Sequence, residues 1–258
     1  MRAPAVRRAL EVEVAAAWRR LGTAPRVLDV GGGSGVWAVP LARSGCVVTV
    51  VDPSPNALAA LHRRAAEAGV QQLVHPVQGD ADALADVVAT AGADLVLGHG
   101  VLEVVEDTAV ATRALADATA PGGAVSVLVA NRYAAVLVRA LAGRLADARR
   151  LLDDPHGRFG AADPLLRRFD TGSLTALIEG SGLVVELLQG DGVVADLVPS
   201  GVLEAHPGAP DQLADLELAA AARPPLRDVA GRLHALARRA DVGGRGQSSK
   251  PPGVGTER

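Results

Sequence analysis

The chain has 258 residues, of which 49% are apolar and 21% charged, and its formal net charge is −3. The apolar fraction excludes wholesale disorder, and a chain of this length folds as one large domain or two small ones. The weak negative charge gives no global attraction to nucleic acid, and a single cysteine, Cys46, excludes an internal disulfide framework.

The first half of the chain alternates predicted helices with short apolar strands. An amphipathic helix over 4–21 opens the chain, because its apolar residues recur at spacings of three and four. Ser54 is expected to cap a later helix, with Pro55 at its first position. Strands separated by helices imply right-handed crossovers and a mainly parallel sheet. The strands are expected at 26–30, 46–51, 73–78, 94–97 and 124–129, and the intervening helices at 36–43, 55–68, after 79–82, and at 108–119.

The second half is less regular. We expect a helix over 133–152, a loop over 153–170, a helix capped by Thr171 that ends at Gly180 or Gly182, a strand over 183–188 and a helix over 211–222. Residues 233–239 follow a Pro-rich turn and fit either a final antiparallel edge strand or a helix, of which we favour the strand. Residues 241–258 are rich in Gly, Pro, Ser and charge, which predicts a disordered tail.

A glycine-rich loop follows the first predicted strand. Ligands of open parallel sheets bind beyond the carboxyl ends of the strands, where Gly31–Gly35 would lie. The loop reads G-x-G-x-G, because the sixth position counted from Gly31 is Val36 and not the glycine of a dinucleotide loop. Asp29 stands two residues before the loop, and a carboxylate there suits a ligand with positive charge. S-adenosylmethionine, which has an ammonium and a sulfonium group, is such a ligand.

Four motifs, in this order, resemble those of class I S-adenosylmethionine-dependent methyltransferases. They are V-L-D-V-G-G-G-S-G at 27–35, V-V-D-P-S at 50–54, Q-G-D-A-D at 78–82 and G-H-G-V-L-E-V-V-E-D at 98–107. The chain is also similar to the branch of the bacterial tRNA wobble-uridine carboxymethoxy methyltransferase, through V-R-R-A-L at 6–10, S-V-L-V-A-N at 126–131 and an acidic segment at 215–217. The resemblance implies an α/β, Rossmann-like fold, with a seven-stranded mainly parallel sheet, helices on both faces and an N-terminal helix.

The same resemblance implies roles for individual residues. Asp52 is expected to accept hydrogen bonds from ribose hydroxyls, although it could instead cap the following helix. Arg7 is expected to hold the cofactor carboxylate through a forked contact, although it could lie on a solvated helix face. The other residues expected to bind S-adenosylmethionine are Asp29, Gly31, Gly32, Gly33, Ala81, Asp82 and His99.

Methyl transfer is an in-line displacement, so the protein chiefly positions the nucleophile against the methyl group. A general base is needed only if the nucleophile must lose a proton. A carboxylate acceptor needs none, whereas a hydroxyl or amine acceptor could use His99 or Glu103 as catalytic residues. The N-P-P-Y signature of amino-group methyltransferases that act on bases or glutamine is absent after the fourth strand.

We expect one methyltransferase domain over 1–240, with a lid-like insertion at 132–170 that meets the acceptor. Residues 132–168 of the insertion have eight arginines and four aspartates, so the insertion either encloses an anionic acceptor or presents a solvated arginine-rich helix. It lacks the lysine-rich run of the tRNA enzymes, which argues against phosphate contacts. The arginines expected to form ion pairs are Arg144, Arg149 and Arg150, with Asp147, Asp153 and Asp154 as their partners.

The sequence therefore predicts methyl transfer to oxygen or nitrogen of a small-molecule acceptor. The alternatives are methylation of a tRNA wobble-uridine carboxyl group and a catalytically silent cofactor-binding protein. No stretch reaches the ~18 apolar residues of a membrane span, and the N-terminus lacks the apolar core of a signal peptide, so we expect a cytoplasmic protein without membrane contact. The remaining histidines show no metal-ligand spacing, so no metal is expected.

Overall fold

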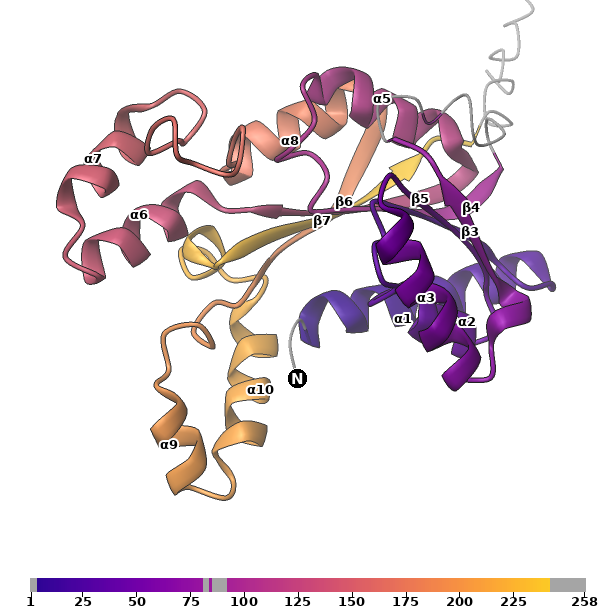
Figure 1. Ribbon diagram of the computed structural model, residues 1–258, viewed down its shortest axis with the longest axis horizontal. Coiled ribbons are helices and arrows are strands. Elements are labelled where there is room, and N and C mark those ends of the chain that lie inside the picture. Colours follow the sequence, from indigo (N-terminus) through magenta and orange to yellow (C-terminus); the bar gives the residue numbers. More distant parts are fainter. Residues whose placement is uncertain (1–3, 81–83, 85–91, 242–258) are drawn as a thin grey trace, which may run out of the picture.

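The fold is organised around one seven-stranded sheet (Figure 1). The computed structural model describes residues 4–80, 84 and 92–241. The strand order is β3-β2-β1-β4-β5-β7-β6; β3, β2, β1, β4 and β5 are parallel, and β7 runs antiparallel to both of its neighbours. The predicted seven-stranded, mainly parallel sheet is confirmed. The strands are β1 (Arg26–Val30), β2 (Val47–Asp52), β3 (Val74–Gln78), β4 (Ala93–His99), β5 (Thr119–Ala130), β6 (Leu183–Asp191) and β7 (Arg232–Arg239).

Helices cover both faces of this sheet. One face carries α1 (Pro4–Leu21), α2 (Ala38–Arg43) and α3 (Pro55–Glu67), and the other carries α5 (Thr108–Ala118) and α8 (Thr171–Gly180). Alternate side chains of a strand point to opposite faces. Leu95 and Leu97 accordingly join the core beneath α1, whereas Val96 joins the core beneath α5. The central strands are buried on both faces, which explains why they are largely apolar.

The helix starts follow capping chemistry. The Ser54 side chain accepts from the backbone N–H of Ala57, with Pro55 at the start of α3, as predicted. The predicted cap of α8 is wrong by one residue. Asp170, and not Thr171, is the N-cap, because its carboxylate accepts from Ser173 N while the Ser173 hydroxyl accepts from Asp170 N. This reciprocal pair is a capping box that a hydroxyl completes.

The single helix predicted over 133–152 is wrong. The segment forms α6 (Arg132–Leu141) and α7 (Leu145–Asp153), with Gly143 between them at a φ of +73°. The N–H of Gly143 donates to Ala140 O and that of Arg144 donates to Arg139 O, which is the Schellman pattern that ends a helix. Apolar periodicity continues through the break, so periodicity alone did not show it.

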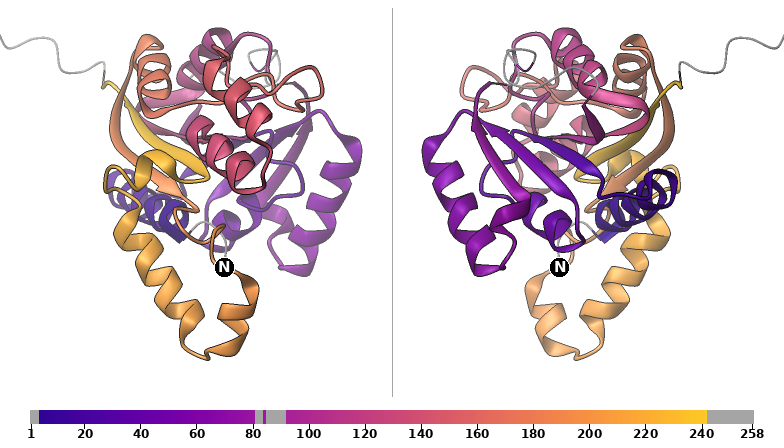
Figure 2. Two further views of the ribbon diagram at one scale, coloured as in Figure 1. Left: turned by 90° about the vertical axis from the view of Figure 1, so that its left-hand side faces the viewer. Right: turned by 90° about the vertical axis from the view of Figure 1, so that its right-hand side faces the viewer.

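The chain from β5 onward differs from prediction in three places. β7 is an antiparallel strand, as favoured, but it lies between β5 and β6, so the edge strand is β6. β5 begins at Thr119, where the sequence predicted the end of a helix and a turn. The connection from β6 to β7 contains an unpredicted helix, α9 (Ser200–Ala205), as well as the expected α10 (Ala209–Ala220), and this pair extends away from the sheet (Figure 2).

Two predicted segments fall largely outside the described residues. They are the helix after 79–82, of which only Leu84 is described, and the tail at 242–258. The short 3₁₀ turns of the described chain are Gln71–Leu73 and Arg227–Val229. No helix among the described residues has the length and apolarity needed to cross a bilayer.

One arginine joins α1 to the two strands, β7 and β6, at one edge of the sheet. Arg238 on β7 forms a two-pronged ion pair with Glu13 of α1, through Nη1–Oε1 at 2.7 Å and Nη2–Oε2 at 2.8 Å. Its Nη2 also lies 2.7 Å from Oε2 of Glu186 on β6. Glu13 is only 4% exposed, so its charge depends on this partner.

We predict that Arg238→Leu lowers the free energy of unfolding by about 3–5 kcal/mol, because it leaves the buried Glu13 charge unpaired. Urea unfolding monitored by circular dichroism measures the change. The matched variant replaces both Glu13 and Arg238 by Leu, and it should recover part of the loss. A double variant no more stable than Arg238→Leu alone would contradict this explanation.

Candidate functional site

The glycine loop lies where β1 ends. Gly31 and Gly33 have φ values of +66° and +56°, a region that side-chain-bearing residues rarely adopt. The N–H of Gly31 donates to Val51 O of β2 at 2.8 Å, which fixes the start of the loop. A Cβ atom on Gly32 would lie 2.5 Å from Asp29 Oδ2. The loop is therefore packed directly on the Asp29 carboxylate, and only glycine fits there.

Asp29 is a buried carboxylate with an unpartnered oxygen. The residue is 1% exposed, and Oδ2 has no hydrogen-bond partner among the described residues. Burial, and then the negative charge of Asp52, raise the pKa of Asp29 to about 7. A buried polar group of this kind usually has a functional reason, and a perturbed pKa near a glycine loop points to a ligand site. A cationic ligand group is the chemistry that would complete it.

Asp52 holds the glycine loop from the neighbouring strand. Its Oδ2 accepts from the N–H of Gly33 at 2.8 Å, and its Oδ1 accepts from the N–H of Ser54 at 2.9 Å. Because Ser54 is the N-cap of α3, the alternative role of Asp52 as that cap is wrong. A carboxylate oxygen can accept more than one hydrogen bond, so both oxygens keep capacity for a ligand. Asp29, Asp52 and His99 lie at the carboxyl ends of three adjacent strands, β1, β2 and β4. All three side chains face α1, because the residue two positions before each of them belongs to the core on that face.

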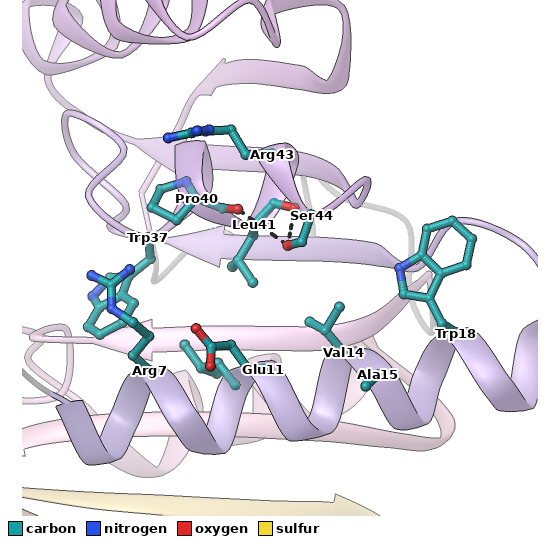
Figure 3. A pocket seen from close by; sticks show the side chains of 11 residues that line it. Arg7, Glu11, Val14, Ala15, Trp18, Trp37, Pro40, Leu41, Arg43 and Ser44 are labelled. Carbon is teal, nitrogen blue, oxygen red and sulfur yellow. Dashed lines mark hydrogen bonds between the residues drawn. The ribbon is translucent and has the colours of Figure 1, made fainter.

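Arg7 and Trp37 line the same pocket, and the sequence motifs did not point to Trp37. Figure 3 shows both side chains at one end of this pocket of about 530 Å³ between α1 and α2. The Arg7 Nε atom is buried and has no partner in the part of the chain that the structure describes, so the side chain is not simply solvated. Trp37 also meets the His99 ring edge-on, with 5.1 Å between centroids. Its position directly after the glycine loop, in a chain with few aromatic residues, was the available signal.

His99 ends β4, as predicted, and its ring is held from one side. Its Nε2 lies 2.8 Å from Ser126 Oγ of β5, while Nδ1 is buried without a partner among the described residues. Burial, and then the neighbouring His234 and Arg232, hold the pKa of His99 well below the ordinary histidine value. The imidazole is therefore neutral at physiological pH.

Glu103 anchors the backbone around it. Its Oε1 accepts from the N–H of Ala130 at 2.7 Å, and its backbone oxygen accepts from the N–H of Leu166 at 2.9 Å. These contacts tie the insertion and the end of β5 to the loop after β4. The other carboxylate oxygen has no partner within the described ranges, and burial raises the pKa of Glu103. Its predicted catalytic role stays a prediction beside this structural one.

The arginines of the insertion are largely engaged within the protein. Arg144 and Arg150 pair with Asp147, and Arg149 pairs with Asp153, as predicted. The predicted ion pair of Asp154 is wrong, because its Oδ1 accepts from two backbone N–H groups, those of His156 and Arg158. The chain around Asp154 forms a tight turn, and the turn takes the carboxylate.

The remaining insertion arginines hold loops in place. Arg168 forms a buried two-pronged pair with Asp163, and that carboxylate also accepts from two backbone N–H groups, which lowers its pKa despite burial. Arg167 donates to the carbonyls of Leu102, Val105 and Glu106. Arg132 donates to two carbonyls, and Arg139 lies 3.9 Å over the Phe159 ring. Most of the arginines of the insertion are therefore engaged in contacts within the protein.

A second connection borders the same edge of the sheet. The Glu217 carboxylate of α10 accepts from three successive backbone N–H groups, those of Val193, Val194 and Ala195, at 2.6–2.9 Å. Between α10 and the end of β6 lies a cavity of about 800 Å³, lined mainly by acidic and apolar side chains with Arg232. The acidic segment around Glu217 carries part of the sequence resemblance, but no local pattern assigned this connection to the site.

Two predicted site residues, Ala81 and Asp82, lie outside the described residues. The structure brings the other predicted residues to one edge of the sheet or to the helix beside it. Within the described part of the chain, no group of three or more His, Cys, Asp or Glu residues could hold a metal ion.

Comparisons with known proteins agree with this arrangement. Residues 3–188 match a family model described as a methyltransferase domain. A ubiquinone biosynthesis O-methyltransferase of Azorhizobium caulinodans is 36% identical over 118 residues, which are 46% of this chain and 45% of that protein. The chain spans about half the length of the curated relatives it matches.

Solved structures share the fold. An S-adenosylmethionine-dependent methyltransferase of Methanosarcina mazei has a TM-score of 0.59 at 15% identity, covering 88% of this chain and 97% of that one. The 1,6-didemethyltoxoflavin-N1-methyltransferase of Burkholderia thailandensis, bound to 1,6-didemethyltoxoflavin and S-adenosylhomocysteine, has a TM-score of 0.53 at 18% identity, covering 90% and 79%. These likenesses confirm the predicted class I methyltransferase fold.

We predict that Asp29→Asn stabilises the folded protein above pH 7. Between about pH 4 and 7 the folded state keeps a proton on Asp29 that the unfolded chain releases, so a rise in pH favours unfolding. A shift of about three pKa units corresponds to roughly 4 kcal/mol, which Asn should remove. Urea unfolding at pH 5 and pH 8 measures the difference. Asp170→Asn, the same loss of charge at a helix cap, is the control, and equal pH dependence in wild type and Asp29→Asn would disprove the assignment.

Proposed function

This chain belongs to the methyltransferase domain family, and we propose that it transfers a methyl group from S-adenosylmethionine to oxygen or nitrogen of a small-molecule acceptor. The observation that carries the cofactor assignment is the buried Asp29 Oδ2 atom, which has no partner among the described residues and lies beneath a loop that only glycine can form. An uncompensated buried carboxylate suits a ligand that brings an ammonium group, and the glycines allow close approach of the backbone.

The residues present fit this cofactor. We assign Asp29 to the ammonium group of the cofactor and Asp52 to its ribose hydroxyls. Arg7 is assigned to the cofactor carboxylate, where its guanidinium would make a charge-assisted contact. Gly31, Gly32 and Gly33 supply the close backbone approach, and Ala81 with Asp82 would contact the adenine. When bound, S-adenosylmethionine supplies an electrophilic methyl group on its sulfonium.

The protein's part in the reaction is chiefly positional. Holding an acceptor atom in line with the methyl group converts an encounter in solution into a reaction within one complex. A carboxylate acceptor would need no proton transfer. For a hydroxyl or amine acceptor, Glu103 is a base candidate because burial raises its pKa, although one of its oxygens is committed to Ala130.

The acceptor is a small molecule in this proposal because the insertion offers few free cations. Seven of its eight arginines contact partners within the described chain: carbonyls, carboxylates or the Phe159 ring. A tRNA would have to be held mainly by free cations at its phosphates. The relative from Azorhizobium caulinodans is named for ubiquinone biosynthesis and the Burkholderia enzyme for a toxoflavin precursor, and both names indicate small molecules. The two connections, 132–170 and 192–231, would border the acceptor.

We predict that Asp52→Ala weakens binding of S-adenosylhomocysteine with the fold retained. The lost contacts are charge-assisted hydrogen bonds worth roughly 1.5–3 kcal/mol each, so affinity should fall at least tenfold. Isothermal titration calorimetry measures it. Asp170→Ala, which removes a carboxylate cap from α8 on the other face of the sheet, is the matched control and should bind normally. Affinity of Asp52→Ala within twofold of wild type would show that Asp52 serves the loop alone.

We predict that label from methyl-labelled S-adenosylmethionine enters a small-metabolite pool and not bulk tRNA. The two acceptor fractions are supplied separately at physiological salt, with the Asp52→Ala variant as the control for enzyme-dependent transfer. Label in tRNA at a wobble uridine would establish the rival tRNA activity. Cofactor binding without label in either fraction would indicate the catalytically silent alternative.

A further inference from the structure

A row of four polar side chains crosses the sheet beneath α1. His99 of β4 contacts Ser126 of β5 through Nε2 and Oγ at 2.8 Å. Ser126 Oγ lies 2.8 Å from His234 Nε2 of β7, and His234 Nδ1 lies 2.9 Å from Gln189 Nε2 of β6. Ser126 and His234 are fully buried and Gln189 is 6% exposed. The row therefore runs through the core and ends at the cofactor edge of the sheet.

The hydrogen bonds in this row have one consistent direction. An amide nitrogen only donates, so Gln189 Nε2 donates to His234 Nδ1, which must then carry no proton. A neutral imidazole with a bare Nδ1 carries its proton on Nε2, so His234 donates to Ser126 Oγ. The Ser126 hydroxyl is left to donate to His99 Nε2. His99 then carries its single proton on Nδ1.

Both imidazoles are neutral, which this direction requires. Burial lowers the pKa of His234 to about 3, and burial with the nearby His234 and Arg232 lowers that of His99. The Nδ1 atom of His99 is the free end of the row, buried and without a partner among the described residues. A donor left unpaired in this way is costly unless another group completes it.

We propose that Gln189, His234 and Ser126 are positioning residues that hold His99 as its Nδ1–H tautomer, so that His99 serves the site as a hydrogen-bond donor and not as a general base. The donor would meet an oxygen or nitrogen lone pair of a bound ligand. This last step rests on the proposed function, whereas the tautomer assignment does not. Glu103 remains the base candidate for an acceptor that must lose a proton.

The direct test is nitrogen-15 NMR of the full chain with labelled histidine imidazoles at pH 7. Long-range proton–nitrogen correlation spectra distinguish the two tautomers, and His99→Asn assigns the His99 signals. We expect His99 to be protonated at Nδ1 and His234 at Nε2. A His99 protonated at Nε2 would overturn the proposal whether or not the protein transfers methyl groups.

The second test removes the relay atom. In Ser126→Ala, His99 should lose its single-tautomer signature, since nothing then donates to Nε2. Ser181→Ala is the matched control, because Ser181 is also buried but donates to Ile178 O at the end of α8. An unchanged His99 spectrum in a folded Ser126→Ala would refute the relay. If that variant does not fold, Gln189→Leu removes the first donor and should release the tautomers of both histidines.

The third test distinguishes a donor from a base. Asn in place of His99 keeps an N–H donor near the Nδ1 position, whereas Ala keeps none. We expect His99→Asn to stay within about threefold of wild type and His99→Ala to fall at least tenfold, in S-adenosylhomocysteine affinity if the donor meets the cofactor or in acceptor KM if it meets the acceptor. Equal values for Asn and Ala in both measurements would overturn the donor role.

Discussion

The Asp29 carboxylate sits against the backbone of Gly32 with no room for a Cβ between them, and its Oδ2 atom has no partner within the described chain. This contact fixes the path of the loop after β1, and Asp52 then fixes the same loop from β2 through Gly33. Burial, and then the negative charge of Asp52 on the adjacent strand, raise the pKa of Asp29 to about 7. The folded chain thus stores an unfavourable charge that a cationic ligand group would relieve.

Other contacts at this edge of the sheet hold the surrounding connections in place. Glu103, Arg167 and Leu166 tie the insertion after β5 to the loop after β4. Glu217 gathers three backbone N–H groups of the connection after β6, and Asn131 donates to two carbonyls before β7. Apart from the backbone contact of Leu166, a buried or half-buried polar side chain here satisfies backbone groups of the connecting loops. Charges that serve this purpose are not free to recruit a polyanionic partner.

The row of His99, Ser126, His234 and Gln189 satisfies buried polar groups in the core in a similar way. Four polar groups that would each be costly to bury alone satisfy one another across β4, β5, β7 and β6. Their mutual satisfaction leaves one atom over, His99 Nδ1, at the edge where the ligand is expected. Structural and functional demands therefore meet in one network, and they assign His99 a different part from the base suggested by its position after β4.

The sequence by itself determined the elements whose signals are local. The alternation of apolar strands and amphipathic helices, the glycine loop with Asp29, and the acid ending β2 all depend on neighbouring residues, and the structure places them as expected. The break at Gly143 was also written locally, but a continuing apolar periodicity outweighed a single glycine.

Only the tertiary structure decided what depends on residues far apart in the chain. β7 lies between β5 and β6 and pairs with both, and no local sequence pattern specifies these two partners. For the same reason, the connection after β6 borders the site, the Trp37 ring meets the His99 ring, and Ser126 contacts His234 across 108 positions of sequence. Hydrogen-bond partners buried on one face of a sheet are set by strand order and register. Both depend on how segments far apart in the sequence pair in the folded chain.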